Sequence, residues 1–243
     1  MSMDYTTDQI YLRDAYRRRA DATVIAARAD AVALESTVFY ATGGGQPHDV
    51  GELADSSGNR WLVSDVRKEG SLIWHRVDSE PPQPGTAVTG TIDWDRRLQL
   101  MRTHTALHIL CGVIWNEWGV PVTGGNMAPL SARMDFEFGP LPDDFAARVT
   151  ELVNAEIAAD RPIEVSFLDR SAALADPELI RTKVNLIPES VTSIRVVDIV
   201  GLDRQADGGT HVASTGAVGR FEITKTESKG TGNKRVRMVL HDA

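Results

Sequence analysis

The fold is decided by residues 94–118, which read WDRRLQLMRTHTALHILCGVIWNEW. Apolar side chains recur there at helical intervals, and neither Gly nor Pro interrupts the stretch before Gly112. Asp93 or Asp95 can cap its start, and residues 119–121, Gly-Val-Pro, end it. We therefore predict one long helix here. The apolar positions that carry this prediction are Leu98, Met101, Leu107, Leu110 and Ile114.

The ninety-odd residues before this helix have a β-rich pattern. Short apolar segments alternate with turn signals, which is typical of a small barrel or sandwich. A glycine-rich segment, residues 42–46, interrupts the regular pattern. The expected strands are residues 23–27, 31–34, 51–54, 61–66, 72–77 and 87–92.

After the long helix the pattern mixes the two kinds of element. An apolar stripe predicts a second helix at residues 143–159. We place a domain boundary near residue 92, between a β-barrel domain at 1–92 and an α+β domain at 93–243. The fold class is α+β. The expected strands of the second domain are residues 133–138, 163–167, 193–199, 220–227 and 235–240.

Composition excludes several classes of protein. The net charge of −8 argues against a general nucleic-acid binder. Residues 220–237 nevertheless carry six basic and two acidic side chains, which suits either an edge that holds a polyanion or a solvated hairpin. The single Cys excludes a disulfide framework and Cys-rich zinc modules. No apolar run is long enough for a membrane span, and the N-terminus lacks signal-peptide features. We expect a soluble, cytoplasmic protein.

Two polar clusters suggest a metal site. His104 and His108 are four residues apart, so both imidazoles leave one face of the helix, about 40° apart. This spacing lets two nitrogens reach one metal ion, although such pairs are more often packed or surface residues. Asp207 and His211 flank a Gly-Gly turn and can supply two more ligands. The alternative for this segment is an ordinary Asp-Gly-Gly turn.

The glycine-rich segment Thr-Gly-Gly-Gly-Gln at 42–46 can expose backbone amides to a ligand. It lacks the spacing and the Lys of a phosphate-binding loop, so it does not imply nucleotide binding. A flexible hairpin turn is the alternative. Gln46 and the nearby Thr37 can recognise a small substrate through hydrogen bonds.

Together and in this order, four motifs resemble the editing region of alanyl-tRNA synthetases and the freestanding alanyl-tRNA editing proteins of the AlaX type. They are LESTVFYATGGGQP at 34–47, RTHTALH at 102–108, GGTHVAST at 208–215 and KGTGNKRVR at 229–237. The resemblance covers residues 20–240, approximately. It implies a small β-barrel followed by an editing domain of the threonyl/alanyl-tRNA synthetase type.

The resemblance also implies a reaction. Family members hydrolyse the ester that joins a wrong amino acid, serine or glycine, to alanine tRNA, without ATP. They bind zinc through residues that match His104, His108 and His211, and Thr37 matches the residue that reads the serine hydroxyl. We expect Thr37 and Gln46 to act in catalysis and, with Gly44 and Gly45, to bind the substrate. Expected contacts to the tRNA are Lys225, Lys229, Lys234, Arg235 and Arg237, with Arg17, Arg18 and Arg19 as a second candidate.

The chain departs from the family at one metal ligand. Asp207 stands where the family has Cys, and a carboxylate should weaken the preference for zinc over harder divalent ions. Our hypothesis is that Asp207 is the fourth ligand. Cys111 shares the helix face of the two His, where it either assists the metal or, as we favour, packs as a small apolar side chain.

The leading interpretation is a zinc-dependent, trans-acting deacylase that binds the acceptor end of alanine tRNA. Ser-tRNA(Ala) is the favoured substrate because Thr37 is present, and Gly-tRNA(Ala) comes second. One alternative is a non-catalytic protein of the same fold that binds tRNA or an aminoacyl ligand and has lost or altered its metal. Another is a hydrolase that acts on a different aminoacyl-tRNA or a small ester.

Overall fold

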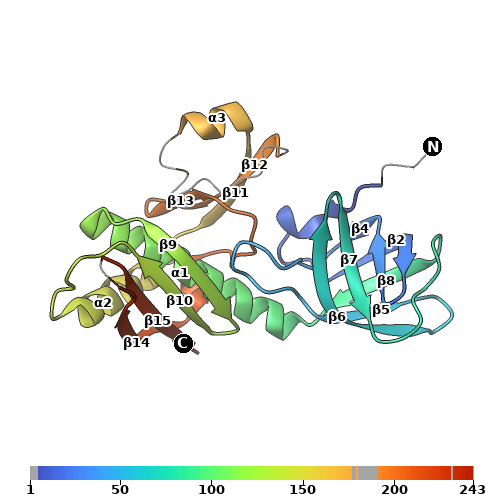
Figure 1. Cartoon of the computed structure of the whole chain (residues 1–243), viewed down its shortest axis with the longest axis horizontal. Coiled ribbons are helices and arrows are strands. Elements are labelled where there is room, and N and C mark those ends of the chain that lie inside the picture. Colours follow the sequence, from blue (N-terminus) through green and yellow to red (C-terminus); the bar gives the residue numbers. More distant parts are fainter. Residues whose placement is uncertain (1–4, 177–178, 180–190, 231, 243) are drawn as a thin grey trace. The chain divides into compact units, whose positions relative to one another are not determined.

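Six strands in the first part of the chain close into a barrel (Figure 1). The computed structural model describes residues 5–176, 179, 191–230 and 232–242. Around the barrel the order is β2-β3-β7-β6-β5-β8, so the sequence prediction of a barrel or sandwich resolves to a barrel. The strands are β2 (Arg19–Arg28), β3 (Ala31–Leu34), β5 (Gly51–Ala54), β6 (Arg60–Glu69), β7 (Leu72–Val77) and β8 (Ala87–Ile92).

The barrel interior is filled by aliphatic side chains, by Phe39, which is fully buried, and by Trp61. A Cβ on Gly90 would lie 3.0 Å from the Phe39 ring, so glycine at this position leaves room for the ring. Two short strands outside the barrel, β1 (Asp8–Gln9) and β4 (Ser36–Thr37), pair in parallel, and η1 (Ile10–Leu12) is a 3₁₀ turn. The sequence did not predict β1 or β4, because two residues are too few to show alternation.

The chain divides into two compact units, Met1–Leu98 and Gln99–Ala243. The division lies inside the long helix α1 (Trp94–Trp118), which has the predicted bounds. The predicted boundary near residue 92 coincides with the last residue of β8. No helix in the described residues is long and apolar enough to cross a membrane.

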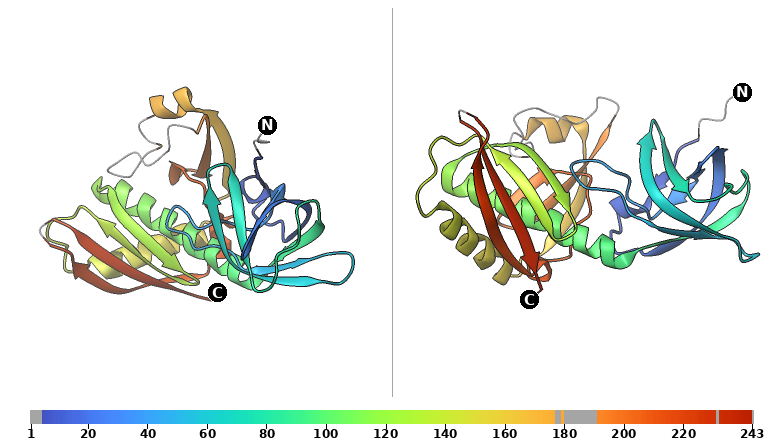
Figure 2. Two further views of the ribbon diagram at one scale, coloured as in Figure 1. Left: turned by 45° about the vertical axis from the view of Figure 1, so that its right-hand side comes forward. Right: turned by 60° about the horizontal axis from the view of Figure 1, so that its bottom comes forward.

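The second unit contains two antiparallel sheets (Figure 2). One has the order β14-β15-β10-β9, built from β9 (Val122–Ala128), β10 (Ser131–Phe136), β14 (Arg220–Ser228) and β15 (Lys234–His241). The other, β11-β12-β13, is built from β11 (Ile163–Asp169), β12 (Ser193–Ile199) and β13 (Asp203–Ala206). The remaining elements are α2 (Phe145–Ala158), the one-turn helix α3 (Arg170–Ala175) and the 3₁₀ turn η3 (Thr215–Val218).

Helix α2 buries the predicted apolar stripe, with Phe145, Val149, Val153 and Ile157 all inside. Its Asn154 amide donates to the Phe221 carbonyl at 2.8 Å and accepts the Phe221 N–H at 2.9 Å, which fixes α2 against β14. The sequence reading missed β9, β13 and α3. Gly124 and Gly125 hide the pattern of β9, β13 is polar, and α3 is a single turn.

One buried ion pair ties the start of α1 to the segment that carries the glycine-rich loop. The side chains of Arg97 and Asp49 are fully buried and paired. The Arg97 guanidinium also donates to the carbonyls of Val38 (2.6 Å) and Ala15 (2.8 Å), and Asp49 accepts the Tyr40 N–H at 2.7 Å. Residues on both sides of the loop are therefore held by one network.

Removing the negative charge should destabilise the barrel, because Arg97 would then be a buried cation without its counterion. We expect Asp49→Asn to lower the free energy of unfolding by about 3 kcal/mol. Urea denaturation followed by tryptophan fluorescence measures this. The control is Asp8→Asn, which breaks an exposed pair with Arg13 and should cost less than about 1 kcal/mol. Equal losses in the two variants would contradict a special role for the buried pair.

Candidate metal centre

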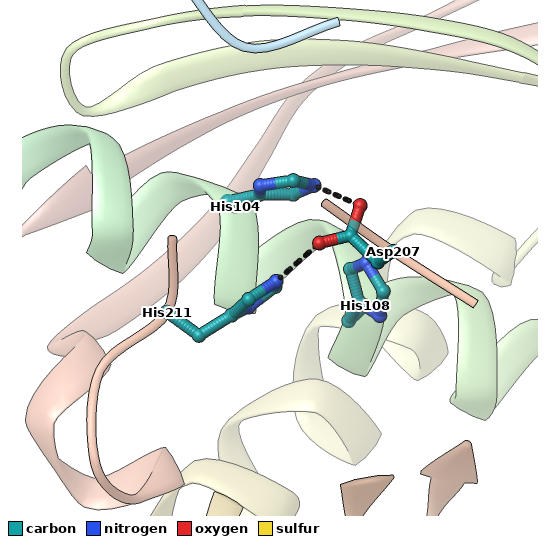
Figure 3. Close-up of side chains that lie close together, drawn as sticks. All are labelled: His104, His108, Asp207 and His211. Atoms are coloured by element: carbon teal, nitrogen blue, oxygen red, sulfur yellow. Dashed lines mark hydrogen bonds and ion pairs between the residues drawn. The ribbon is translucent and has the colours of Figure 1, made fainter. Parts of the chain in front are cut away.

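Helix α1 presents two imidazoles on one face, as the i, i+4 spacing predicts. The rings of His104 and His108 are buried, and their centroids lie 5.2 Å apart (Figure 3). His104 Nε2 is directed toward the Asp207 carboxylate, 3.6 Å from Oδ1. The helix therefore supplies two of the four predicted donors.

The other two donors come from the loop after β13. Asp207 is fixed on β12 by two backbone contacts, since its N–H donates to the Arg195 carbonyl at 3.1 Å and its own carbonyl accepts from the Arg195 guanidinium at 2.9 Å. Its Oδ2 accepts the Gly209 N–H at 2.6 Å, which closes the turn. The expected Asp-Gly-Gly turn and the expected donor cluster thus coexist in one segment.

The loop then returns to α1 at His211. The His211 ring lies 4.5 Å from the His104 ring and 4.7 Å from the His108 ring, measured between centroids. His211 Nε2 lies 3.0 Å from Asp207 Oδ2, while Nδ1 lies 3.2 Å from the hydroxyl of Thr105. The Thr105 hydroxyl also accepts the Val212 N–H at 3.3 Å. Thr105 therefore holds both the ring and the backbone of the loop.

The donor atoms of His104, His108, Asp207 and His211 all lie within 4.8 Å of one another. Three imidazoles thus surround one carboxylate in the interior of the second unit (Figure 3). The structure brings together all four residues that the sequence predicts as ligands. Cys111 is buried nearby on α1 but is outside this group, and its sulfur accepts a hydrogen bond from Gln205 at 3.3 Å.

A second carboxylate lies behind His108. His108 Nδ1 is 3.3 Å from Asp203 Oδ2, and the Gln205 amide donates to the same oxygen at 2.7 Å. Gly112 makes this approach possible, because a Cβ there would lie 3.0 Å from the Asp203 Cβ. With Nδ1 facing Asp203, the ring offers Nε2 to the cluster. Carboxylates in this position orient metal-binding histidines.

Sequence reasoning missed Asp203, Gln205, Arg195 and Thr105 as parts of this site. The only local signal was the alternation of Asp203 and Gln205 on β13, which places both on one face of a strand that was itself not predicted. Arg195 lies on a strand that was predicted, but nothing in its neighbourhood indicates that it faces Asp207. Its guanidinium is 3.7 Å from Asp207 Oδ2.

The surroundings set the protonation of the four donors. Burial lowers the pKa of His104 well below its ordinary value, and burial lowers the pKa of His211 to about 4. For His108, burial lowers the pKa, but the carboxylates of Asp203 and Asp207 outweigh it and the net shift is upward. Burial would raise the pKa of Asp207, but the facing imidazoles hold it well below its ordinary value.

This donor set fits a divalent cation. His104 and His211 are neutral and offer lone pairs, and Asp207 is ionised. Three nitrogens and one carboxylate oxygen are accepted zinc ligands. Asp207 brings a negative charge to the cluster, and a cation held by the four donors would pair with that charge.

The predicted substrate residues belong to the first unit. The glycine-rich segment forms a tight two-residue turn, in which Gly43 and Gln46 exchange backbone hydrogen bonds of 2.8 and 3.1 Å. Gly44 and Gly45 both have positive φ, +54° and +84°, which only glycine adopts readily. Both glycines are exposed and Gln46 is buried. The Thr37 side chain is buried, and its hydroxyl faces His75.

The expected tRNA contacts lie on the hairpin β14–β15 and differ in their surroundings. Lys225 and Arg237 both pair with Glu227, at 2.8 and 2.7 Å. Arg235 forms a two-pronged pair with Asp135 at 2.7 Å and is mostly buried. Lys229 is exposed, and Lys234 donates to the Ser228 hydroxyl at 3.1 Å. Three of these five cations are therefore engaged in ion pairs, with two carboxylates between them.

Comparisons with known proteins agree with this architecture. A family model for class II (A) tRNA synthetases matches residues 4–96, and one for the threonyl and alanyl tRNA synthetase second additional domain matches residues 194–237. The chain is 36% identical to an alanine–tRNA ligase of Pyrobaculum arsenaticum over 234 residues, 93% of this chain but 26% of the ligase.

Freestanding relatives match over nearly their whole length. An alanyl-tRNA editing protein AlaX-M of Saccharolobus solfataricus is 35% identical over 232 residues, 95% of this chain and 97% of that protein. An AlaX-M protein of Methanosarcina barkeri is 34% identical over 242 residues, 97% of this chain and 100% of that protein. The chain therefore belongs to the AlaX family of alanyl-tRNA editing proteins.

Proposed function

We propose that this protein is a trans-acting, metal-dependent deacylase that releases serine, and secondarily glycine, from mischarged alanine tRNA. One observation carries the proposal, namely the convergence of three imidazoles and one carboxylate in a buried site. The names of its relatives support the class of substrate, since they are alanyl-tRNA editing proteins.

A separate hydrolytic site has a clear physical purpose. A pocket sized for alanine cannot bind alanine much better than glycine, and it rejects an added hydroxyl poorly. A second site can correct these errors if it recognises what the first cannot. The serine hydroxyl gives such a site a hydrogen-bonding group that alanine lacks.

His104, His108, Asp207 and His211 would hold the metal, which we propose to be zinc. Zinc would supply Lewis acidity toward the aminoacyl ester or its attacking water. His104 and His211 remain neutral through burial, so they can bind without first losing a proton. Asp203 and Thr105 orient His108 and His211 from behind. We assign Thr37, Gly44, Gly45 and Gln46 to binding of the aminoacyl group.

We also propose that the protein works in the cytoplasm and meets the acceptor end of alanine tRNA through basic side chains. Lys229 is the hairpin residue best suited to a phosphate, because it is exposed and forms no ion pair among the described residues. Arg17, Arg18 and Arg19 form a second basic surface on the first unit. Arg18 stacks on Trp94, with its guanidinium carbon 4.0 Å from the ring centroid.

Loss of one metal donor should weaken metal binding and abolish deacylation. We expect His104→Ala and Asp207→Ala to bind zinc at least about 100-fold more weakly, because removing a ligand costs more than removing its orienting partner. Both variants should fail to release serine from Ser-tRNA(Ala). Metal analysis after dialysis, isothermal titration with zinc and a deacylation time course provide the measurements.

His241→Gln is the matched control, because His241 lies on β15 outside the cluster, bonded to Glu222. It should retain metal and activity. Serine release by metal-free protein would contradict the metal role, and tight zinc binding without any turnover would indicate a binding protein instead of an enzyme.

Phosphate contacts should appear in the salt dependence of tRNA binding. Lys229→Glu should weaken binding and lower the slope of log Kd against log salt by about one, as for the loss of one phosphate contact. Arg235→Gln should leave that slope unchanged and lower stability, since Arg235 is committed to Asp135. Fluorescence anisotropy at several salt concentrations measures both. A change of slope in Arg235→Gln alone would overturn this assignment.

A further inference from the structure

A buried histidine is bonded to the residue that we assign to substrate recognition. His75 Nε2, on β7, lies 2.8 Å from the hydroxyl oxygen of Thr37, on β4. The Thr37 side chain is 2% exposed and that of His75 0%. The His75 ring also packs edge-on against Phe39, with centroids 5.3 Å apart. The sequence analysis did not single out His75.

The second ring nitrogen identifies the tautomer. His75 Nδ1 lies 3.3 Å from the carbonyl oxygen of Val32, and a carbonyl only accepts. Burial lowers the pKa of His75 to about 4, although the carbonyls of Val32 and Ile73 oppose the shift, so the ring is neutral at neutral pH. A neutral imidazole carries one proton. That proton is on Nδ1, and Nε2 is a bare acceptor.

The tautomer determines the direction of the next hydrogen bond. Because Nε2 has no proton, the Thr37 hydroxyl must donate to it. The same hydroxyl oxygen accepts the Phe39 N–H at 3.1 Å. A hydroxyl has one donor and two acceptor positions. Thr37 has therefore used its donor and one acceptor position, and no further partner occurs among the described residues.

We infer that His75 is a positioning residue. It accepts the one proton of the Thr37 hydroxyl, so Thr37 can only accept, and not donate, a hydrogen bond when it contacts the aminoacyl side chain. Thr37 then accepts a hydrogen bond from the hydroxyl of a seryl ester. Glycyl and alanyl esters have no side-chain hydroxyl to donate at this position, and Thr37 has no free proton to donate to a carbonyl in its place. This inference rests on the proposed function, because it presumes that Thr37 meets the substrate.

The functional test is the ratio of kcat/KM for Ser-tRNA(Ala) to that for Gly-tRNA(Ala). His75→Leu removes the acceptor and frees the Thr37 hydroxyl to rotate, so the ratio should fall about tenfold, as for one misplaced hydrogen bond. His75→Gln can restore the acceptor with its amide oxygen and should recover most of the ratio. Thr37→Val should lower the ratio at least as much as His75→Leu. His241→Gln serves as the control histidine variant and should leave the ratio at the wild-type value.

A purely structural role would give a different result. His75→Leu and His75→Gln would then slow both substrates by the same factor, which overturns the inference, as does an unchanged ratio in His75→Leu. If no variant and no wild-type protein releases either amino acid, the proposed function fails instead.

The tautomer is tested directly on the wild-type protein, independently of folding of any variant. Nitrogen-15 NMR of the histidine side chains at neutral pH should show His75 protonated on Nδ1 and bare on Nε2. A His75 ring with its proton on Nε2, or a charged ring, would overturn the inference whatever the kinetics show.

Discussion

A buried carboxylate enclosed by three imidazoles is the constraint on which the second unit depends. Asp207 loses its hydration there, and two of the surrounding rings are themselves held neutral by burial. The carboxylate keeps its charge because nitrogen donors and the Arg195 guanidinium face it. A cation bound by the same donors would pair with this carboxylate and stabilise the cluster. Neighbouring residues support this arrangement. Gly112 leaves space for Asp203, the Thr105 hydroxyl accepts the Val212 N–H where the loop comes back to α1, and the Arg195 carbonyl on β12 accepts the Asp207 N–H.

The first unit holds polar side chains in fixed positions within and beside an apolar barrel. The Arg97–Asp49 pair fixes both flanks of the glycine turn, and positive φ at Gly44 and Gly45 makes the turn tight. Thr37 and His75 form a pair whose hydrogen-bond directions follow from the contact of His75 Nδ1 with the Val32 carbonyl. In both units, a backbone carbonyl or a second polar side chain fixes the group that we assign to chemistry.

The sequence predicted the barrel strands and α1, because periodicity is a local property. It predicted the four clustered donors from the i, i+4 histidine spacing, from the Asp-Gly-Gly-Thr-His segment and from the order of motifs that resembles the editing proteins. It did not predict β13, so Asp203 and Gln205 were missed, and their roles arise only when β13 packs on α1 at Gly112. His75 was missed for a related reason, since its partners Val32 and Thr37 are about 40 residues away in the chain. Arg235 was predicted as a tRNA contact from the local excess of basic residues, and its pairing with Asp135 was not predicted because it depends on the register of β10 with β15.

We propose that Asp207 takes the metal position that the family resemblance assigns to Cys. X-ray absorption spectroscopy of the zinc-loaded wild-type protein can distinguish the two kinds of ligand. We expect four light ligands at about 2.0–2.2 Å, from imidazole nitrogens and a carboxylate oxygen, without sulfur. A sulfur ligand at about 2.3 Å would show instead that Cys111 binds the ion and that Asp207 is not the fourth ligand.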